Sequence, residues 1–303
     1  MAGPTVSGLT SSLVEKGPEI FKKQVNALDL SAEGIQVYKA VSKPIALPKL
    51  SASGNPRPYT AADSVGAGAA FTDRTLTVYQ SKWDFDLDPE QYRNTYLNTY
   101  LGSDGTAPEI HQYIMDQVIT EYKAAINDSV IWSGVRNASG TTAASIATGF
   151  ESLIATAISG SEITPISTSA ITSSNAVTQV DAFVDGLPVW MLKKGVQILC
   201  SYGVFMNYRT HYRTLNTYSF EKNPNGFYNL DGFNNITLVP VSWLPKTSDR
   251  LIATVAGNMI FGTDSEQVQV HATMSRNIVN VRLMLPVGFQ IADTAALFVN
   301  NQS

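Results

Sequence analysis

The stretch PEIHQYIMDQVITEYKAAINDSVIWSG, residues Pro108–Gly134, has the clearest helical period in the sequence. Its apolar residues recur at steps of three and four, at Ile110, Ile114, Val118, Tyr122, Ile126 and Val130. This spacing is typical of an amphipathic helix that packs one face on a core. Pro108 suits a first helical turn and Gly134 favours an end, so we predict a helix over residues 108–133, roughly 40 Å long. A rod of this length among short strands indicates a structural spine.

The composition limits what kind of protein this is. The chain has 303 residues, of which 44% are hydrophobic, enough for one large core or two moderate ones. Charged residues make up only 15%, and the net charge is −4. A surface so poor in charge is either neutral and polar or covered by partners. The slight acidity argues against a broad nucleic-acid-binding surface.

The sequence carries no export or membrane signal. Its first thirty residues lack a basic segment followed by an apolar one, and no apolar run approaches about 18 residues. We therefore expect no secretory export and no membrane partner. The one cysteine, Cys200, excludes an intrachain disulfide. It lies in an apolar run over residues 196–200, and we interpret it as a small buried hydrophobic residue, not a nucleophile.

The first part of the chain predicts an arm. Residues 1–43 carry short helical patterns over residues 11–25 and 31–40, with a mild excess of basic residues. This segment has too little apolar surface to form a domain, so we predict that it docks elsewhere.

Residues 44–81 predict a long hairpin. Pro44 and Pro48 suit an edge strand, where a missing backbone donor is tolerated, and residues 76–80 resume a strand. The tip between them, residues 51–71, is rich in Gly, Ala and Pro and has almost no core-forming side chains. A loop of this length inside a compact domain is uncommon unless it has a function. The chain itself offers nothing to bury it.

The remaining elements follow from periodicity. Strict alternation over residues 83–88 predicts a half-buried strand with its acids on one face. Helices are predicted over residues 150–158, after the cap residue Asn175, and over residues 202–215. Other apolar runs predict strands, over residues 196–200, 236–241, 251–255, 268–273, 278–285 and 289–299. This order indicates an α+β fold without a repeated βαβ pattern.

Several motifs could carry chemistry, and a cluster of acids is the first. Asp84, Asp86, Asp88 and Glu90 raise a calcium hypothesis. An EF-hand loop counted from Asp84 needs Gly at its sixth position and Glu at its twelfth, where this chain has Pro89 and Thr95. We therefore interpret the acids as a solvated strand face.

The other motifs are also weak. Gly66-Ala-Gly68 lacks the preceding strand, third glycine and following helix of a dinucleotide site. His111, His211 and His271 are isolated, and no zinc or nucleophile-elbow motif occurs. We expect no metal site, no cofactor, no catalytic residue and hence no enzyme.

Aromatic and basic residues crowd the helix predicted over residues 202–215. Tyr202, Tyr208, Arg209, Tyr212 and Arg213 could stack nucleic-acid bases. The same residue types are enriched at protein interfaces, and the interface is the interpretation we favour.

Taken in order, these segments resemble the major capsid proteins of tailed bacteriophages, the Hong Kong 97-like fold. The hairpin over residues 44–81 resembles the extended loop of the family, and the helix over residues 108–132 resembles its spine helix. Residues 175–212 resemble its axial domain. The motifs GFNNI (232–236), NMIFGTD (258–264) and GFQI (288–291) resemble its C-terminal half. The resemblance covers nearly the whole chain.

The resemblance implies a domain layout. An N-terminal arm would span residues 1–43 and the extended-loop hairpin residues 44–81. A peripheral domain with the spine helix would span residues 82–160 and an axial domain residues 161–262. Residues 263–303 would return as strands to the peripheral domain.

The resemblance also implies a function in assembly. The subunits would form pentamers and hexamers of an icosahedral shell around packaged double-stranded DNA, with a portal and with separate scaffold or decoration proteins as further partners. The protein would assemble in the host cytoplasm and end in the virion. Candidate contacts between subunits are Lys43, Lys49, Arg57, Arg74, Tyr208, Arg209 and Arg213.

Two alternatives stay open. An encapsulin, a bacterial shell that holds protein cargo, has the same fold, and a monomeric enzyme with a site near residues 209–213 is a more distant one. Some family members carry a charged helical scaffolding segment of about a hundred residues before the arm. Here the hairpin begins near residue 44, so we expect a separate scaffold or a mature form.

Overall fold

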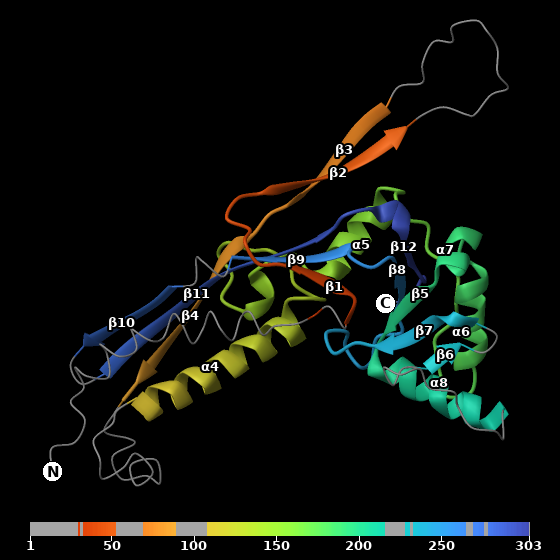
Figure 1. Cartoon of the computed structure of the whole chain (residues 1–303). Coiled ribbons are helices and arrows are strands. Elements are labelled where there is room, and N and C mark those ends of the chain that lie inside the picture. The colour runs from red at the N-terminus through yellow and green to blue at the C-terminus, as the bar shows by residue number, and fades with distance from the viewer. Residues whose placement is uncertain are drawn as a thin grey trace, which may run out of the picture.

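The structure is a computed structural model that describes residues 30, 33–52, 69–88, 108–215, 228–230, 233–264, 269–275 and 278–302. These residues form two five-stranded sheets, a separate two-stranded hairpin and the helices packed around them. Figure 1 shows an elongated molecule, with one sheet and the long helix α4 on one side and the second sheet with α6, α7 and α8 on the other.

The first sheet is organised by β11 (Ile278–Ile291). Strand β4 (Tyr79–Leu87) pairs antiparallel along one side of β11. On the other side lie β10 (Gln269–Ser275) and then β9 (Met259–Thr263), and β1 (Ile35–Tyr38) runs parallel to β9. Alternate residues of β11 are buried against the core, as a period of two requires: Val279, Val281, Leu283, Leu285 and Val287.

Helix α4 (Pro108–Ser129) lies along this sheet, and its stripe enters the same core (Figure 1). Ile119, Tyr122 and Ile126 are almost fully buried there. The helix ends four residues before the predicted end, because residues 130–133 form a turn. Close backbone packing fixes this turn, since a Cβ on Gly134 would meet the Val130 carbonyl oxygen at 2.5 Å. The spine prediction is confirmed apart from this last turn.

The second sheet has the order β12-β8-β5-β7-β6. Its strands are β12 (Leu297–Val299), β8 (Leu251–Thr254), β5 (Val196–Cys200), β7 (Phe233–Pro240) and β6 (Tyr228–Leu230). Helices α6 (Ala176–Asp185), α7 (Val189–Lys194) and α8 (Tyr202–Leu215) share an apolar core with this sheet. Helix α5 (Phe150–Ser159) belongs to the core of the first sheet, and two short 3-10 turns, η2 (Ala143–Ser145) and η3 (Thr294–Ala296), complete the described elements.

The hairpin consists of β2 (Ile45–Ala52) and β3 (Ala69–Leu76), which pair antiparallel from Ile45↔Leu76 to Ala52↔Ala69. Neither strand joins one of the larger sheets. Figure 1 shows the hairpin projecting away from the body, as the sequence predicts. Pro48 lies within β2. Both strands of a two-stranded sheet are edge strands that pair on one side only, so a missing backbone N–H is tolerated there.

Two predicted elements are wrong. The helix predicted over residues 31–40 is instead strand β1, because Gly34 adopts a left-handed φ of +82° that ends any helix before Ile35. The strand predicted over residues 289–299 is interrupted. β11 ends at Ile291, and the 3-10 turn η3 follows, with Asp293 Oδ1 accepting a hydrogen bond from the Ala295 amide at 2.9 Å.

A third prediction, the strand that resumes the hairpin over residues 76–80, is displaced: β3 ends at Leu76 and β4 begins at Tyr79, so residues 77–78 separate two strands. The remaining predicted strands and helices in the described ranges are confirmed within a few residues, except that β11 continues six residues past the predicted end, and α7, β6 and β9 were not predicted. Asn175 occupies the cap position of α6, but its side-chain oxygen accepts from the Thr172 amide instead of a helical amide. The domain division stays a prediction. The pairing places β9 in the first sheet and β12 in the second, which differs from the assignment of residues 259–262 to the axial domain and of residues 297–299 to the returning strands.

Candidate assembly surfaces

The root of the hairpin is a small apolar cluster separate from the two main cores. Leu76 is fully buried against Val41 and Ile260, with Leu47 packed beside them. Ile45, which pairs with Leu76 across the hairpin, keeps 38% of its surface exposed. The hairpin is therefore attached to the body by a few side chains at one end.

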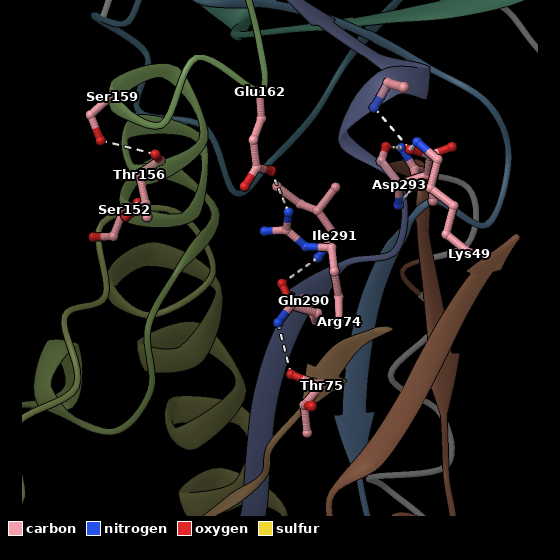
Figure 2. Close-up of polar contacts among 12 residues, drawn as sticks. Lys49, Arg74, Thr75, Ser152, Thr156, Ser159, Glu162, Gln290, Ile291 and Asp293 are labelled. Carbon is pink, nitrogen blue, oxygen red and sulfur yellow. Dashed lines mark hydrogen bonds and ion pairs between the residues drawn. The ribbon is translucent and has the colours of Figure 1, made fainter. Parts of the chain in front are cut away.

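Two ion pairs fix the next residues of the hairpin, and Figure 2 shows both. Arg74 Nη1 lies 2.6 Å from Glu162 Oε2, just after α5. Lys49 Nζ lies 2.5 Å from Asp293 Oδ1, between β11 and η3. A third contact holds the backbone of the hairpin: Gln290 Nε2 on β11 donates a hydrogen bond to the Thr75 carbonyl oxygen on β3 at 2.8 Å. We call Arg74, Glu162, Lys49 and Asp293 the clasp.

The register of the hairpin places the clasp on one face. Lys49 is opposite Thr72 and Arg74 is opposite Leu47, so both cations lie on the face that carries Leu76. The other face presents Ala46, Pro48, Asp73 and Thr75, all of which are exposed. One face is thus committed to the body of its own chain, and the other is available to a neighbour.

The second surface lies on α8. Tyr202 and Met206 are half exposed, at 50% and 51%, and four residues apart they share one helix face. Arg213 is exposed in the last turn, and Arg209 is partly exposed one turn before it. These four residues form an outward stripe of the residue types that are enriched at protein interfaces.

The predicted contact Tyr208 is instead a core residue. Only 2% of its surface is exposed, and its ring stacks on that of Tyr212 with the centroids 6.1 Å apart. The position follows from helical geometry, because Tyr208 lies four residues after the buried Val204 and three before the buried His211. Tyr208 therefore supports α8 from beneath and has no surface for a neighbouring subunit.

An exposed apolar pair on α7 was not predicted from the sequence. Val189 and Trp190 are 65% and 48% exposed, next to the exposed Lys193 and Lys194. The sequence contains a signal for this pair, because Val189 and Trp190 follow Pro188 in a helix too short to bury both of its faces. The pairing partners Glu162 and Asp293 were also missed, and no local pattern indicates them.

The exposed acids Asp84 and Asp86 of β4 have side-chain partners on the surface of the sheet. Arg282 Nε donates to Asp84 Oδ1 at 2.5 Å, which lowers the pKa of the Asp84 carboxyl, and Lys82 Nζ lies 3.3 Å from Asp84 Oδ2. Asn280 donates to Asp86. The apolar residues of β4 point to the other face, as the alternation predicts. In the described part of the chain, no group of His, Cys, Asp or Glu could hold a metal ion.

The remaining reactive side chains are engaged in the fold. His211 is buried and its Nδ1 accepts from the Val177 amide at 3.0 Å, whereas His271 contacts Gln269 at the surface. Cys200 is fully buried, and burial raises the pKa of its thiol. The side chain of His111 lies outside the described residues. No helix of the described ranges has both the length and the apolar character needed to cross a membrane.

The seven predicted contact residues are therefore dispersed. Lys43 is exposed just before β2, Lys49 and Arg74 belong to the clasp, and Arg57 lies outside the described residues. Arg209 and Arg213 lie on the α8 stripe at the other side of the molecule. The structure does not bring these residues into one site. For the six residues other than the buried Tyr208, contact with other subunits stays a prediction.

Comparison with known proteins supports the fold and no closer relationship. No protein-family model matches the chain, and no curated protein matches its sequence. Solved structures match over most of its length. The satellite phage P4 procapsid gives a TM-score of 0.54 at 11% identity, covering 92% of this chain and 98% of that one. The capsid of Myoviridae phage XM1 gives 0.54 at 12% identity, covering 88% and 89%.

A bacterial structure matches as well. The SrpI encapsulin complex of Synechococcus elongatus PCC 7942 gives a TM-score of 0.50 at 9% identity, covering 92% of this chain and 86% of that one. At such low identities the likeness concerns the fold alone. The α+β architecture, with its projecting hairpin, long spine helix and second sheet, is the Hong Kong 97-like capsid fold.

Proposed function

We propose that this chain is a structural shell protein, the major capsid protein of a tailed bacteriophage. It assembles into pentamers and hexamers of an icosahedral head around double-stranded DNA and has no catalytic role. The observation that carries the proposal is the whole-chain likeness to capsid subunits, with coverage near 90% of both chains.

The hairpin supports the proposal physically. A two-stranded sheet alone is at best marginally stable in water. Here β2 and β3 pair only with each other, and the exposed face has Ala46, Pro48, Asp73 and Thr75. A neighbouring subunit that covers this face would supply the burial that its own chain does not.

Electron microscopy of the expressed protein tests the proposal. We expect hollow shells with five- and six-fold capsomers, in equilibrium with subunits of 32.8 kDa. A single species of that mass at every concentration, without particles in the presence of candidate scaffold proteins, would contradict it.

The encapsulin match supports a second candidate, a shell that encloses protein cargo. Particles isolated from their native source separate the two functions. Nuclease-protected double-stranded DNA and an attached portal indicate the phage head. A co-purifying enzyme inside particles without protected DNA indicates the nanocompartment.

A further inference from the structure

Strands β4 and β10 flank β11, and they differ in the charge of their exposed side chains. β4 and β10 pair with the same part of β11, one on each side: Val279 is opposite both Leu87 and Met274, and Leu283 is opposite both Trp83 and Val270. Each strand therefore presents an outer edge of backbone N–H and C=O groups. In the part of the chain that the structure describes, β10 pairs with β11 alone.

The β4 edge carries charges, and the β10 edge does not. Lys82, Asp84 and Asp86 project from β4 and are exposed. Charged side chains of this kind on an outer strand oppose pairing with another chain. β10 has the sequence QVHATMS, without Lys, Arg, Asp, Glu, Pro or Gly. Its exposed side chains, at Gln269, His271 and Thr273, are short or neutral hydrogen-bonding groups that a paired strand tolerates.

The sheet also leaves a position beside β10. On the side of β11 opposite β4, strands β9 and β10 follow one another end to end and form one row. Strand β1 lies beside β9 and begins a second row, and among the described strands none continues this second row beside β10. The chain leaves this row after Tyr38, and Ala40 makes only an isolated bridge to Asp264. A strand placed beside β10 would thus continue the row that β1 begins. Val270 is buried and would already be held against the core under such a strand.

We propose that β10 pairs antiparallel with β10 of a second copy of this chain across a two-fold axis at Ala272, within the shell of the proposed function. The strand is self-complementary in this register. His271 comes opposite Thr273 of the copy and Ala272 opposite Ala272, so no like charges meet. The hairpin strands fit less well, because β2 contains Pro48 and β3 brings the charges of Asp73 and Arg74. A two-fold contact needs only one self-complementary patch, as in most closed assemblies.

A seven-residue pair is too small to hold two subunits by itself. Stable interfaces bury about 1,200–2,000 Å² in total, far more than two short strands provide. The contact therefore forms in the assembled shell, where other contacts raise the effective concentration of the partner strand. Free subunits at low concentration are expected to leave the β10 edge unpaired.

Disulfide trapping tests the register. In the His271→Cys/Thr273→Cys variant, each cysteine faces the other position of the copy at a cross-strand distance that a disulfide can bridge. Oxidised shells should run mostly as covalent dimers on a non-reducing gel, and dilute free subunits should remain monomers. The matched Asp84→Cys/Asp86→Cys variant has the same spacing on β4 and should stay monomeric in shells. Native Cys200 is buried and adds no background.

A charge pair provides the second measurement. His271→Glu/Thr273→Glu places like charges opposite each other and should abolish shells, whereas His271→Glu/Thr273→Lys places opposite charges there and should retain them. Both variants carry the same His271→Glu change beside Arg282 of their own chain, so its effect on the fold is common to the two. Oxidised shells of the His271→Cys/Thr273→Cys variant without covalent dimers, or equal assembly of the two charge variants, would overturn the pairing. Absence of shells from the unmodified chain would overturn the proposed function and this inference with it.

Discussion

Arg74 Nη1 and Glu162 Oε2 lie 2.6 Å apart although 88 residues separate them in the chain. The contact joins the root of the projecting hairpin to the segment that follows α5. Together with the ion pair between Lys49 on β2 and Asp293 after β11, this contact fixes the direction in which the hairpin leaves the body. In a shell, that direction decides which surface of the next subunit the hairpin meets.

The clasp should matter more for assembly than for stability. Arg74 and Glu162 side chains are 24% and 48% exposed, so their coupling in a double-mutant cycle should be at most about 1 kcal/mol. Arg74→Ala or Glu162→Ala should nevertheless speed amide exchange at residues 72–76 and lower shell yield, and Arg74→Glu/Glu162→Arg should restore both. The pair Arg282–Asp84 is a control of similar length, and its loss should leave exchange in the hairpin unchanged.

Burial at the root predicts a sharp contrast between two paired residues. Leu76→Ala should cost about 2–4 kcal/mol of unfolding free energy, because it leaves a cavity beside Val41 and Ile260. Ile45→Ala, on the opposite strand and 38% exposed, should cost less than about 1 kcal/mol. Urea unfolding followed by circular dichroism measures both. Equal losses would mean that the root is not packed as described.

Shortening the hairpin should separate folding from assembly. Deletion of residues 52–72 leaves the pairs Leu47↔Arg74 and Pro48↔Asp73, joined by the three residues 49–51, a loop length common in hairpins. We expect a soluble subunit with an unchanged circular dichroism spectrum that no longer forms stable shells. Unfolding of the deletion variant would contradict the proposal that the hairpin serves other subunits.

Helix α8 should respond differently on its two faces. Arg213→Glu changes an exposed residue of the last turn and should destabilise the subunit by about 1 kcal/mol or less while lowering capsomer yield. Tyr208→Ala removes a buried ring and should cost about 3–5 kcal/mol. Thermal unfolding together with sedimentation of the assembled species distinguishes the two effects. If Arg213→Glu assembles normally, the α8 stripe is not a contact.

Alkaline pH should destabilise the subunit through two buried groups. Burial raises the pKa of the Cys200 thiol above its ordinary 9.0 and that of the Tyr122 phenol above its ordinary 10.0. The unfolded chain then loses these protons at a lower pH than the folded chain. Stability is therefore full below pH 9 and falls as the pH rises past 9 and then 10, by up to about 1.4 kcal/mol per unit for each group. Cys200→Ala should remove the first decline and Tyr122→Phe the second in urea titrations from pH 8 to 10.5.

Local patterns in the sequence were enough to predict the spine helix α4. The period of α4 matches its buried stripe because an amphipathic helix is specified by residues within two turns of one another. The same holds for β4, whose alternation places Lys82, Asp84 and Asp86 outside. Where a single residue overrides the pattern, local inference fails. Gly34, with its positive φ, converts a helical prediction into strand β1.

The candidate surfaces were less accessible to sequence reasoning. Arg74 and Lys49 are basic residues in a hairpin, and their sequence gives no reason to prefer a neighbour over Glu162 and Asp293 of the same chain. Tyr208 and Arg213 are five residues apart on one helix, and which of them faces the core depends on where the second sheet lies.

The amino-acid sequence by itself determined the kind and order of most elements: the extended hairpin, the long helix and the strands that follow it. These depend on backbone propensity and on a hydrophobic period of a few residues. Only the tertiary structure decided that the hairpin is clasped at its root, that Tyr208 is buried, and that β10 and β4 flank β11 with unlike edges. Those relations join residues up to 244 positions apart, and such contacts follow from how the sheets pack, not from any pattern along the chain.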